Sequence, residues 1–284
     1  MSTTRIRKAL VVIVGIILIV FLLSIIRAFV GKPGERIGVL EIEGVIAESR
    51  QTMEDIVHYK EDPSIKGVVL RINSPGGSVG PTQEIFREVI KLKEKKKVFV
   101  SMGSLCASGG YYLAAAGEKI YASPSTITGR IGVIMQSVIL EDLLKKIGVK
   151  SNTIKAGDLK DAGTPFREMT SDERAYLDGV VKNIHEQFIK DIAAGRSMDI
   201  EKARKLADGR IYTGLQAKEL GLIDNIGNFY DTVDDMKKAL NIKGKPELIY
   251  TEKPFSLSKW IFSSISKESF ESFFSSPFKF LYYP

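Results

Sequence analysis

Histidine, cysteine and tryptophan are scarce in this chain of 284 residues, which has two histidines, one cysteine and one tryptophan. The single cysteine, Cys106, excludes an internal disulfide. The histidines, His58 and His185, lie far apart and form no cluster with the spacing of metal ligands. These shortages argue against a metalloprotease, and we expect neither a metal nor another cofactor.

Nucleic-acid binding is also not expected, although the formal net charge is +7 and the pI is near 9.2. The basic run at 91–97 closes an amphipathic helical pattern, where cations suit the negative end of the helix dipole and face water. It lacks the interleaved aromatic residues that stack on bases. Attraction to anionic lipid headgroups stays open, beside a simply solvated face.

Only one long apolar run is present, at the N-terminus. Residues 9–26 carry no charge over 18 positions, just enough for a helix to cross the bilayer core. Arg5, Arg7 and Lys8 precede it and favour a cytoplasmic N-terminus. A cleaved signal peptide is the alternative, but 27–31 offers no good cleavage site. We therefore predict a cytoplasmic segment at 1–8, a single-pass anchor in the cell membrane at 9–30, and a catalytic part on the extracytoplasmic side.

The remaining chain divides into one domain and a tail. No linker interrupts residues 31–252, which are long enough for one large domain. Residues 253–284 combine aromatic residues with serines and contain no apolar run that could span a membrane. This tail either lies at the membrane interface or against a neighbouring protomer, or it is a mobile end.

Alternating patterns predict an α/β fold for the domain. Strands are expected at Ile37–Ile42, Gly67–Ile72, Val98–Met102, Lys119–Tyr121 and Ile131–Ile139. Helices are expected at Thr82–Lys95, Ser108–Ala116, Glu141–Ile147, Ser171–Ala194 and Gly214–Leu220. The sequence from Thr170 to Glu173 is a good start signal for the helix near Ser171.

Two segments suggest a Ser-Lys protease: one contains Ser108 followed by two glycines, and the other contains Lys160. A serine hydroxyl is a poor nucleophile at neutral pH, so another group must take its proton. A lysine amine can do this only where burial or a nearby cation keeps it neutral. Lys160 lies among Gly157, Leu159, Ala162 and Phe166, a setting expected to be dry after folding.

Two glycine-rich turns are candidates for an oxyanion hole, in which backbone N–H groups face the developing negative charge. One turn, at 73–78, follows an apolar strand pattern and contains Gly76 and Gly77. The other begins at Gly109, directly after Ser108, where a helical pattern starts. Each turn alone is equally consistent with an ordinary loop or helix cap.

Other nucleophiles and bases were weighed against this pair. Cys106 lies two residues before Ser108, but a lone cysteine in an apolar stretch is usually a small packing residue. His185 lies downstream, where it would be needed for a Ser-His-Asp triad. Its place within a helical pattern is explained by a polar position on the helix surface.

Taken in order, these motifs resemble the signal peptide peptidase A (SppA) serine proteases, relatives of the Clp protease and crotonase folds. The resemblance covers about residues 36–245 and includes the segments 73–78, 107–112, 128–133, 160–166, 208–217 and 221–224. It implies a spiral of ββα repeats. It also implies that Ser108 is the nucleophile, Lys160 the general base, and Gly77 and Gly109 the donors of the oxyanion hole, with Gly76 less suited to that role.

One position departs from the family pattern. A serine that orients the lysine often follows the Thr-Gly pair, but Arg130 follows Thr128 and Gly129 here. Either another hydroxyl, such as that of Thr128, orients the lysine, or the lysine is held differently. The arginine side chain is expected to face solvent.

The resemblance implies a membrane-anchored endopeptidase that degrades remnant signal peptides and similar apolar peptides. It also implies a ring-shaped homo-octamer in which each site takes its serine from one subunit and its lysine from the next. A related quality-control protease for membrane proteins and a proteolytically silent scaffold on the same fold are the alternatives. An acyl-CoA enzyme of the crotonase type is more distant, because that chemistry does not need a Ser-Lys pair.

Overall fold

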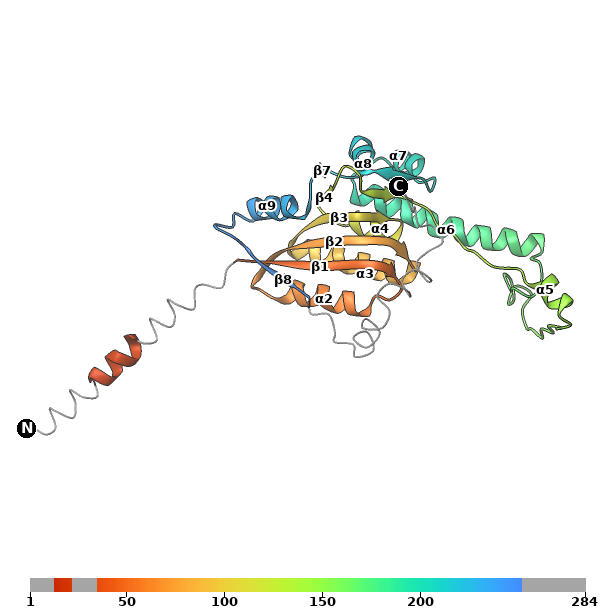
Figure 1. Ribbon diagram of the computed structural model, residues 1–284, viewed down its shortest axis with the longest axis horizontal. Coiled ribbons are helices and arrows are strands. Elements are labelled where there is room, and N and C mark those ends of the chain that lie inside the picture. The colour runs from red at the N-terminus through yellow and green to blue at the C-terminus, as the bar shows by residue number, and fades with distance from the viewer. Residues whose placement is uncertain (1–12, 22–34, 252–284) are drawn as a thin grey trace, which may run out of the picture. The chain divides into compact units, whose positions relative to one another are not determined.

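The computed structural model describes residues 13–21 and 35–251 (Figure 1). Residues 13–21 are helical. From residue 35 onward the elements are β1 (Arg36–Ile46), α2 (Arg50–Glu61), β2 (Ile65–Gly77), α3 (Val79–Lys95), β3 (Lys97–Ala107), α4 (Gly109–Ala114), β4 (Lys119–Ala122), β5 (Ile127–Gly129), α5 (Glu141–Lys146), α6 (Ser171–Gly195), α7 (Ile200–Leu206), β6 (Ile211–Thr213), α8 (Gly214–Leu220), β7 (Asn225–Ile226), α9 (Phe229–Ala239) and β8 (Glu247–Tyr250).

The strands form one mixed sheet. Its main path runs β6-β5-β3-β2-β1-β8, and β4 pairs with both β3 and β7. Every pair is parallel except β5 with β6. Parallel neighbours need crossover connections, which α2 and α3 supply between the first three strands. The predicted α/β class is therefore confirmed.

Both faces of the central strands are buried, as expected for a parallel sheet. Val68 and Leu70 of β2 belong to the larger apolar cluster, which α3, α4 and the second half of α6 complete. Val69, between them, points to the opposite face and packs with Phe99 and with Met236 of α9. Because side chains alternate along a strand, a continuous apolar run fills two cores at once.

Most predicted elements are confirmed, but the strand predicted at Ile131–Ile139 is wrong. The strand at this point is β5, which lies between β3 and β6 and ends at Gly129. Gly129 and Arg130 both have positive φ, 78° and 51°, and this turn takes the chain away from the sheet. The β-branched residues that follow have no partner strand among the described residues.

The segment leaving this turn, residues 133–170, is here called the arm. It contains the short helix α5, and Figure 1 shows α5 beside the first turns of α6. No residue of the arm is fully buried. Helix α6 begins at the predicted place, where Thr170 and Glu173 form a capping box. Its second half enters the core through Phe188, Ile189 and Ile192.

Within the described ranges, 13–21 and 35–251, no helix is both long and apolar enough to cross a membrane. The structure thus gives no support for the predicted anchor at 9–30. Only its central residues, 13–21, are described, and they are helical. The rest of that segment, the cytoplasmic residues 1–8 and the tail at 253–284 lie outside the described residues.

Candidate active site

Ser108 lies in a strained turn between a strand and a helix. It follows the last residue of β3 and precedes α4, with φ at 54° and ψ at −122°. This backbone conformation costs an L-residue about 1–3 kcal/mol and persists only where the surroundings enforce it. Ser108 donates its N–H to the carbonyl of Gly129 at 2.8 Å, and its carbonyl accepts from the N–H of Tyr112 at 2.9 Å. Such a turn presents a serine hydroxyl at the end of a sheet.

The two glycine-rich turns meet beside Ser108. A Cβ atom on Gly76 would lie 2.5 Å from the nitrogen of Gly109 and 3.0 Å from the Cβ of Ser108. A Cβ atom on Gly109 would lie 3.3 Å from the nitrogen of Gly77. Glycine at Gly76 is therefore required both by this close approach and by its φ of 94°. The fold brings Gly77, Gly109 and Ser108 together around one space.

Ser74 determines which N–H groups at this turn are already paired. The buried Ser74 hydroxyl accepts a hydrogen bond from the N–H of Gly76 at 3.1 Å and donates one to the carbonyl of Gly44 at 2.6 Å. The N–H of Gly76 therefore already has a partner. This agrees with the expectation that Gly76 is less suited than Gly77 to bind an oxyanion.

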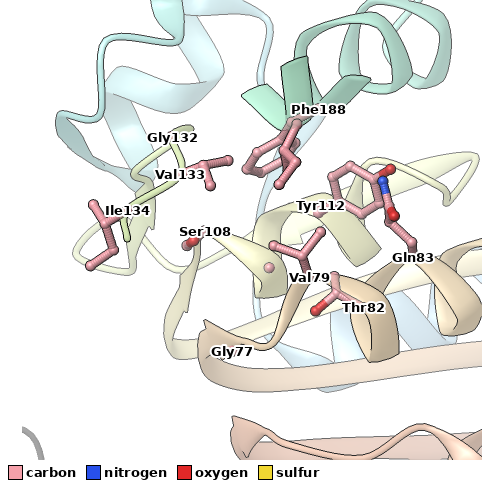
Figure 2. A pocket seen from close by; sticks show the side chains of 12 residues that line it. Gly77, Val79, Thr82, Gln83, Ser108, Tyr112, Gly132, Val133, Ile134 and Phe188 are labelled. Atoms are coloured by element: carbon pink, nitrogen blue, oxygen red, sulfur yellow. The ribbon is translucent and has the colours of Figure 1, made fainter. Parts of the chain in front are cut away.

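A cavity of about 120 Å³ opens next to Ser108 (Figure 2). Its lining is mainly apolar and comes from the end of β2, from α3, from Ser108 and α4, from residues 132–134 and from α6: Gly77, Val79, Thr82, Gln83, Ser108, Gly109, Tyr112, Gly132, Val133, Ile134, Ile184 and Phe188. Figure 2 shows Ser108 at one side of this space, between Gly77 and the Gly132–Ile134 segment. A cavity with this lining can receive an apolar side chain of a peptide.

The far wall of the cavity is held rigidly. The ring of Tyr112 packs between Phe86 and Phe188, with centroid distances of 4.6 and 4.7 Å. The Tyr112 hydroxyl donates to the carboxylate of Asp191. Sequence reasoning assigned no pocket residues. The one available signal is that Tyr112 lies four residues after Ser108, on the same face of a helix.

Lys160 is not part of this cavity. It lies in the arm, in a turn where its N–H donates to the carbonyl of Gly157 at 3.2 Å, and its side chain is exposed. Leu159 and Phe166 are also exposed, by 42% and 45%. The expectation of dry surroundings for Lys160 is therefore wrong for the single chain, because the arm has no apolar core of its own.

The length of α6 between the Lys160 turn and the Ser108 cavity indicates how far apart these two parts of the chain lie. The Lys160 turn is bound to Glu173 in the first turn of α6 through Asp161 and Arg167. The first α6 residue that lines the Ser108 cavity is Ile184. At 1.5 Å per residue, Glu173 and Ile184 are separated by about 16 Å along the helix axis. The structure thus brings Ser108, Gly77 and Gly109 together but does not add Lys160 of the same chain.

Thr128 and Arg130, where the sequence departs from the family pattern, differ in burial. Thr128 is fully buried and donates its hydroxyl to the carbonyl of Cys106 at 2.7 Å. That hydroxyl is therefore engaged within the sheet. Arg130 is exposed, as expected, and its N–H donates to the carbonyl of Arg210 at 2.7 Å.

The alternative nucleophile and base do not line the cavity. Cys106 is completely buried, and burial raises the pKa of its thiol far above the usual range. His185 has a buried Nε2 atom without a hydrogen-bond partner among the described residues, so it is not simply a solvated surface residue. In the part of the chain that the structure describes, no group of three or more histidine, cysteine or acidic side chains is arranged to hold a metal.

Comparison with known proteins identifies two matching family models. Peptidase family S49 matches residues 90–243, a range that includes Ser108 and Lys160. The Clp protease family matches residues 35–129, which contain Gly77, Ser108 and Gly109. The second match agrees with the mixed α/β sheet described above.

Individual relatives carry related names. A protein of Enterococcus faecium named for signal peptide peptidase SppA is 33% identical over 252 residues, covering 84% of this chain and 73% of the relative. The chloroplastic serine protease SPPA of Arabidopsis thaliana is 34% identical over 222 residues, covering 78% and 32%. Protease 4 of Haemophilus influenzae is 30% identical over 216 residues, covering 72% and 35%.

Proposed function

The chain belongs to peptidase family S49 and is a serine peptidase, and we propose that it cleaves apolar peptides with Ser108 as nucleophile and Lys160 as general base. The observation that carries this proposal is the strained backbone of Ser108 at the meeting point of two glycine-rich turns. Strain of this kind collects at functional sites, where the surrounding structure enforces it.

The proposed reaction proceeds through an acyl-enzyme. The Ser108 hydroxyl attacks the scissile carbonyl, and its proton passes to the Lys160 amine. The N–H groups of Gly77 and Gly109 bind the oxyanion, which collapses as the leaving amine takes the proton from Lys160. Water then attacks the ester and gives a proton to the same amine. Release of the peptide acid returns that proton to Ser108.

A second copy of the chain is the proposed source of the lysine. The Lys160 turn is bound to the start of α6, whereas the Ser108 cavity is lined by residues from the middle of that helix. This separation supports the proposal that a neighbouring arm completes the site. The arm carries many exposed apolar side chains that a neighbour would cover: Ile134, Met135, Val138, Ile139, Leu143, Ile147, Val149 and Ile154. Such contact would also dry Lys160, as its role as a base requires. The octameric ring implied by the family resemblance is the proposed assembly.

The proposed substrates are remnant signal peptides and similar apolar peptides. The relative from Enterococcus faecium bears a signal peptide peptidase name. The apolar lining of the Ser108 cavity, with Val79, Tyr112 and Phe188, suits an apolar side chain next to the scissile bond. We also propose that residues 9–30 anchor the chain in the cell membrane with the peptidase domain outside the cytoplasm. The uncharged run at 9–26 supports the membrane anchor, and the cations Arg5, Arg7 and Lys8 before it support a cytoplasmic N-terminus.

The test uses the full chain in detergent and a fluorogenic peptide with an apolar residue before the scissile bond. Ser108→Ala and Lys160→Ala should each abolish hydrolysis, whereas Lys150→Ala, at another exposed lysine of the arm, should not. Mixing and reassembling the two inactive chains should restore part of the activity if sites are shared. Full activity of Lys160→Ala would remove the lysine from the mechanism. A mixture that stays inactive would show that each site is self-contained.

A further inference from the structure

The turn that carries Lys160 is held by four charged side chains, Lys155, Asp161, Arg167 and Glu173, here called the clamp. Arg167 is its centre. Its two terminal nitrogens donate to the two carboxylate oxygens of Glu173 at 2.8 and 2.5 Å, and its Nε donates to Asp161 at 3.1 Å. Paired hydrogen bonds of this kind fix a guanidinium in position and direction.

The anchoring end of the clamp is Glu173, in the first turn of α6. Its side chain is only 4% exposed, although it belongs to a region with no apolar core. Its carboxylate also accepts the N–H of Thr170, which completes the capping box. The bonds from Arg167, and then that from Thr170, lower the pKa of Glu173 to about 2, so it is ionised in neutral solution.

At the other end of the clamp, Lys155 binds one residue that precedes Lys160 and one residue that follows it. Lys155 donates to the carbonyl of Asp158 at 2.6 Å and to the carboxylate of Asp161 at 2.5 Å. Asp158 lies two residues before Lys160, and Asp161 follows it directly. The backbone of the turn is thus tied to α6, whereas the side chain of Lys160 takes no part in the network.

The clamp also occupies the carboxylate closest to Lys160 in the sequence. Asp161 is only 13% exposed and is paired with both Lys155 and Arg167, which lower its pKa in that order. Among the described residues, no acidic side chain forms an ion pair with Lys160. Besides the clamp residues, the acidic groups around this turn are Asp158 and Asp172 beside it, and Glu141 and Glu168, where the start of α5 contacts the end of the arm. A free carboxylate next to a lysine stabilises its charged form and opposes its use as a base.

We propose that Arg167 is a positioning residue that acts through Asp161: it holds the Lys160 turn against α6 and keeps the Asp161 carboxylate away from the lysine amine. This inference rests on the proposed role of Lys160 as general base. Arg167 itself touches neither substrate nor Ser108. Substitution of Arg167 would change the activity of the neighbouring active site, to which its own chain contributes Lys160.

Two substitutions separate the two effects. Arg167→Ala breaks the link to α6 and releases Asp161, so kcat should fall with little change in KM, and the acid limb of the pH profile should move to higher pH. Asp161→Asn weakens the same link, because a neutral amide oxygen replaces the carboxylate, and leaves no carboxylate beside the lysine, so kcat should fall without that movement. Arg167→Lys, which keeps the charge but not the paired geometry, should recover part of the rate. Arg204→Ala removes an exposed arginine paired with Glu186 on α6 and serves as the control.

The decisive experiment places Arg167→Ala on one partner of the mixed assembly. On the Ser108→Ala chain, which lends the lysine, it should lower the restored activity at least about tenfold, since small displacements of a reacting group are costly. On the Lys160→Ala chain, which lends the serine, the restored activity should change less than about twofold, because that chain's arm lends no base. Thermal unfolding and size-exclusion chromatography report whether each chain folds and assembles.

Equal losses in both placements would overturn the proposal, because they indicate a general structural role. If Arg167→Ala does not fold, Asp161→Asn is used in the same two placements, since it leaves the pairing of Arg167 with Glu173 intact. Failure of the proposed function is visible beforehand, as activity in Lys160→Ala alone. If the unmodified mixture is inactive, the pH profiles of homogeneous Arg167→Ala and Asp161→Asn decide. Identical profiles and rates to those of the unaltered chain would refute the positioning role.

Discussion

The N–H of Ser108 donates a hydrogen bond to the carbonyl oxygen of Gly129, 2.8 Å away. Because Ala107 is paired with Gly129 in the ladder between β3 and β5, this bond continues the ladder one residue beyond the end of β3. It fixes Ser108 while the chain turns sharply into α4. The sheet therefore holds the strained conformation of Ser108, the proposed nucleophile, before any substrate binds.

Relief of this strain should be measurable. We expect Ser108→Gly to be more stable than Ser108→Ala by about 1 kcal/mol, since glycine adopts positive φ freely and alanine does not. For a domain of this size, that difference corresponds to a rise of about 2–4 °C in Tm. Both variants should be inactive. A glycine variant that melts at or below the temperature of the alanine variant would contradict the strain argument.

Gly76 should tolerate no side chain. Gly76→Ala would place a methyl group 2.5 Å from the Gly109 nitrogen and would force a φ of 94° on alanine. We expect a loss of at least about 1–3 kcal/mol in stability, the range for such strain, and loss of most hydrolytic activity. Gly80→Ala is the control, because no atom lies within 4 Å of its added Cβ in α3. Activity at the normal level in Gly76→Ala would show that the two turns need not meet so closely.

The Thr128 hydroxyl should be structural. Thr128→Val removes the side-chain hydrogen bond to the buried carbonyl of Cys106, which should lower stability by about 0.5–1.5 kcal/mol. The pH profile of hydrolysis should keep its shape, because this hydroxyl is engaged inside the sheet. Thr126→Val, which removes a similar bond to the carbonyl of Gly103, is the matched comparison. A displaced profile in Thr128→Val alone would mean that Thr128 helps to orient the lysine.

Local patterns predicted the central elements well because each carries its own signal. The apolar run at Gly67–Ile72 and the cap at Thr170 can be recognised from adjacent residues alone, and they predict β2 and the start of α6. The predicted strand at Ile131–Ile139 failed for a complementary reason. Strand formation needs a partner, and the turn at Arg130 carries these β-branched residues away from the sheet. Helix α2 was missed because its sequence, RQTMEDIVHYKE, has few apolar residues.

Only those parts of the site whose residues are adjacent in the sequence could be predicted. The glycines beside Ser108 could be named because turns and helix starts have residue signatures. The pocket walls could not, because Val79, Tyr112 and Phe188 come from three separate helices. The surroundings of Lys160 were predicted incorrectly because neighbours in sequence were treated as neighbours in space, whereas the turn lies on an exposed arm.

The clamp should make the arm sensitive to acid. The pKa of Glu173 is lowered in the folded state from 4.5 to about 2, so its contribution to stability is complete above 4.5 and is lost as pH falls toward 2. Glu173→Gln should therefore lose stability at pH 6 but show a smaller further loss between pH 4.5 and 2 than the unaltered chain. Thermal unfolding across pH 2–6 measures this, with Glu219→Gln as an exposed control. Parallel curves for the two chains would contradict the assignment.

The separation of the two proposed reacting groups along α6 has a consequence for the life of the enzyme. If Lys160 must come from a second copy, a newly made protomer carries a poised serine but no base, and is in effect its own zymogen. Activity at low abundance would then rise more steeply than in proportion to protein concentration. Dilution below the concentration at which copies assemble would then silence the protease without an inhibitor or a removable propeptide.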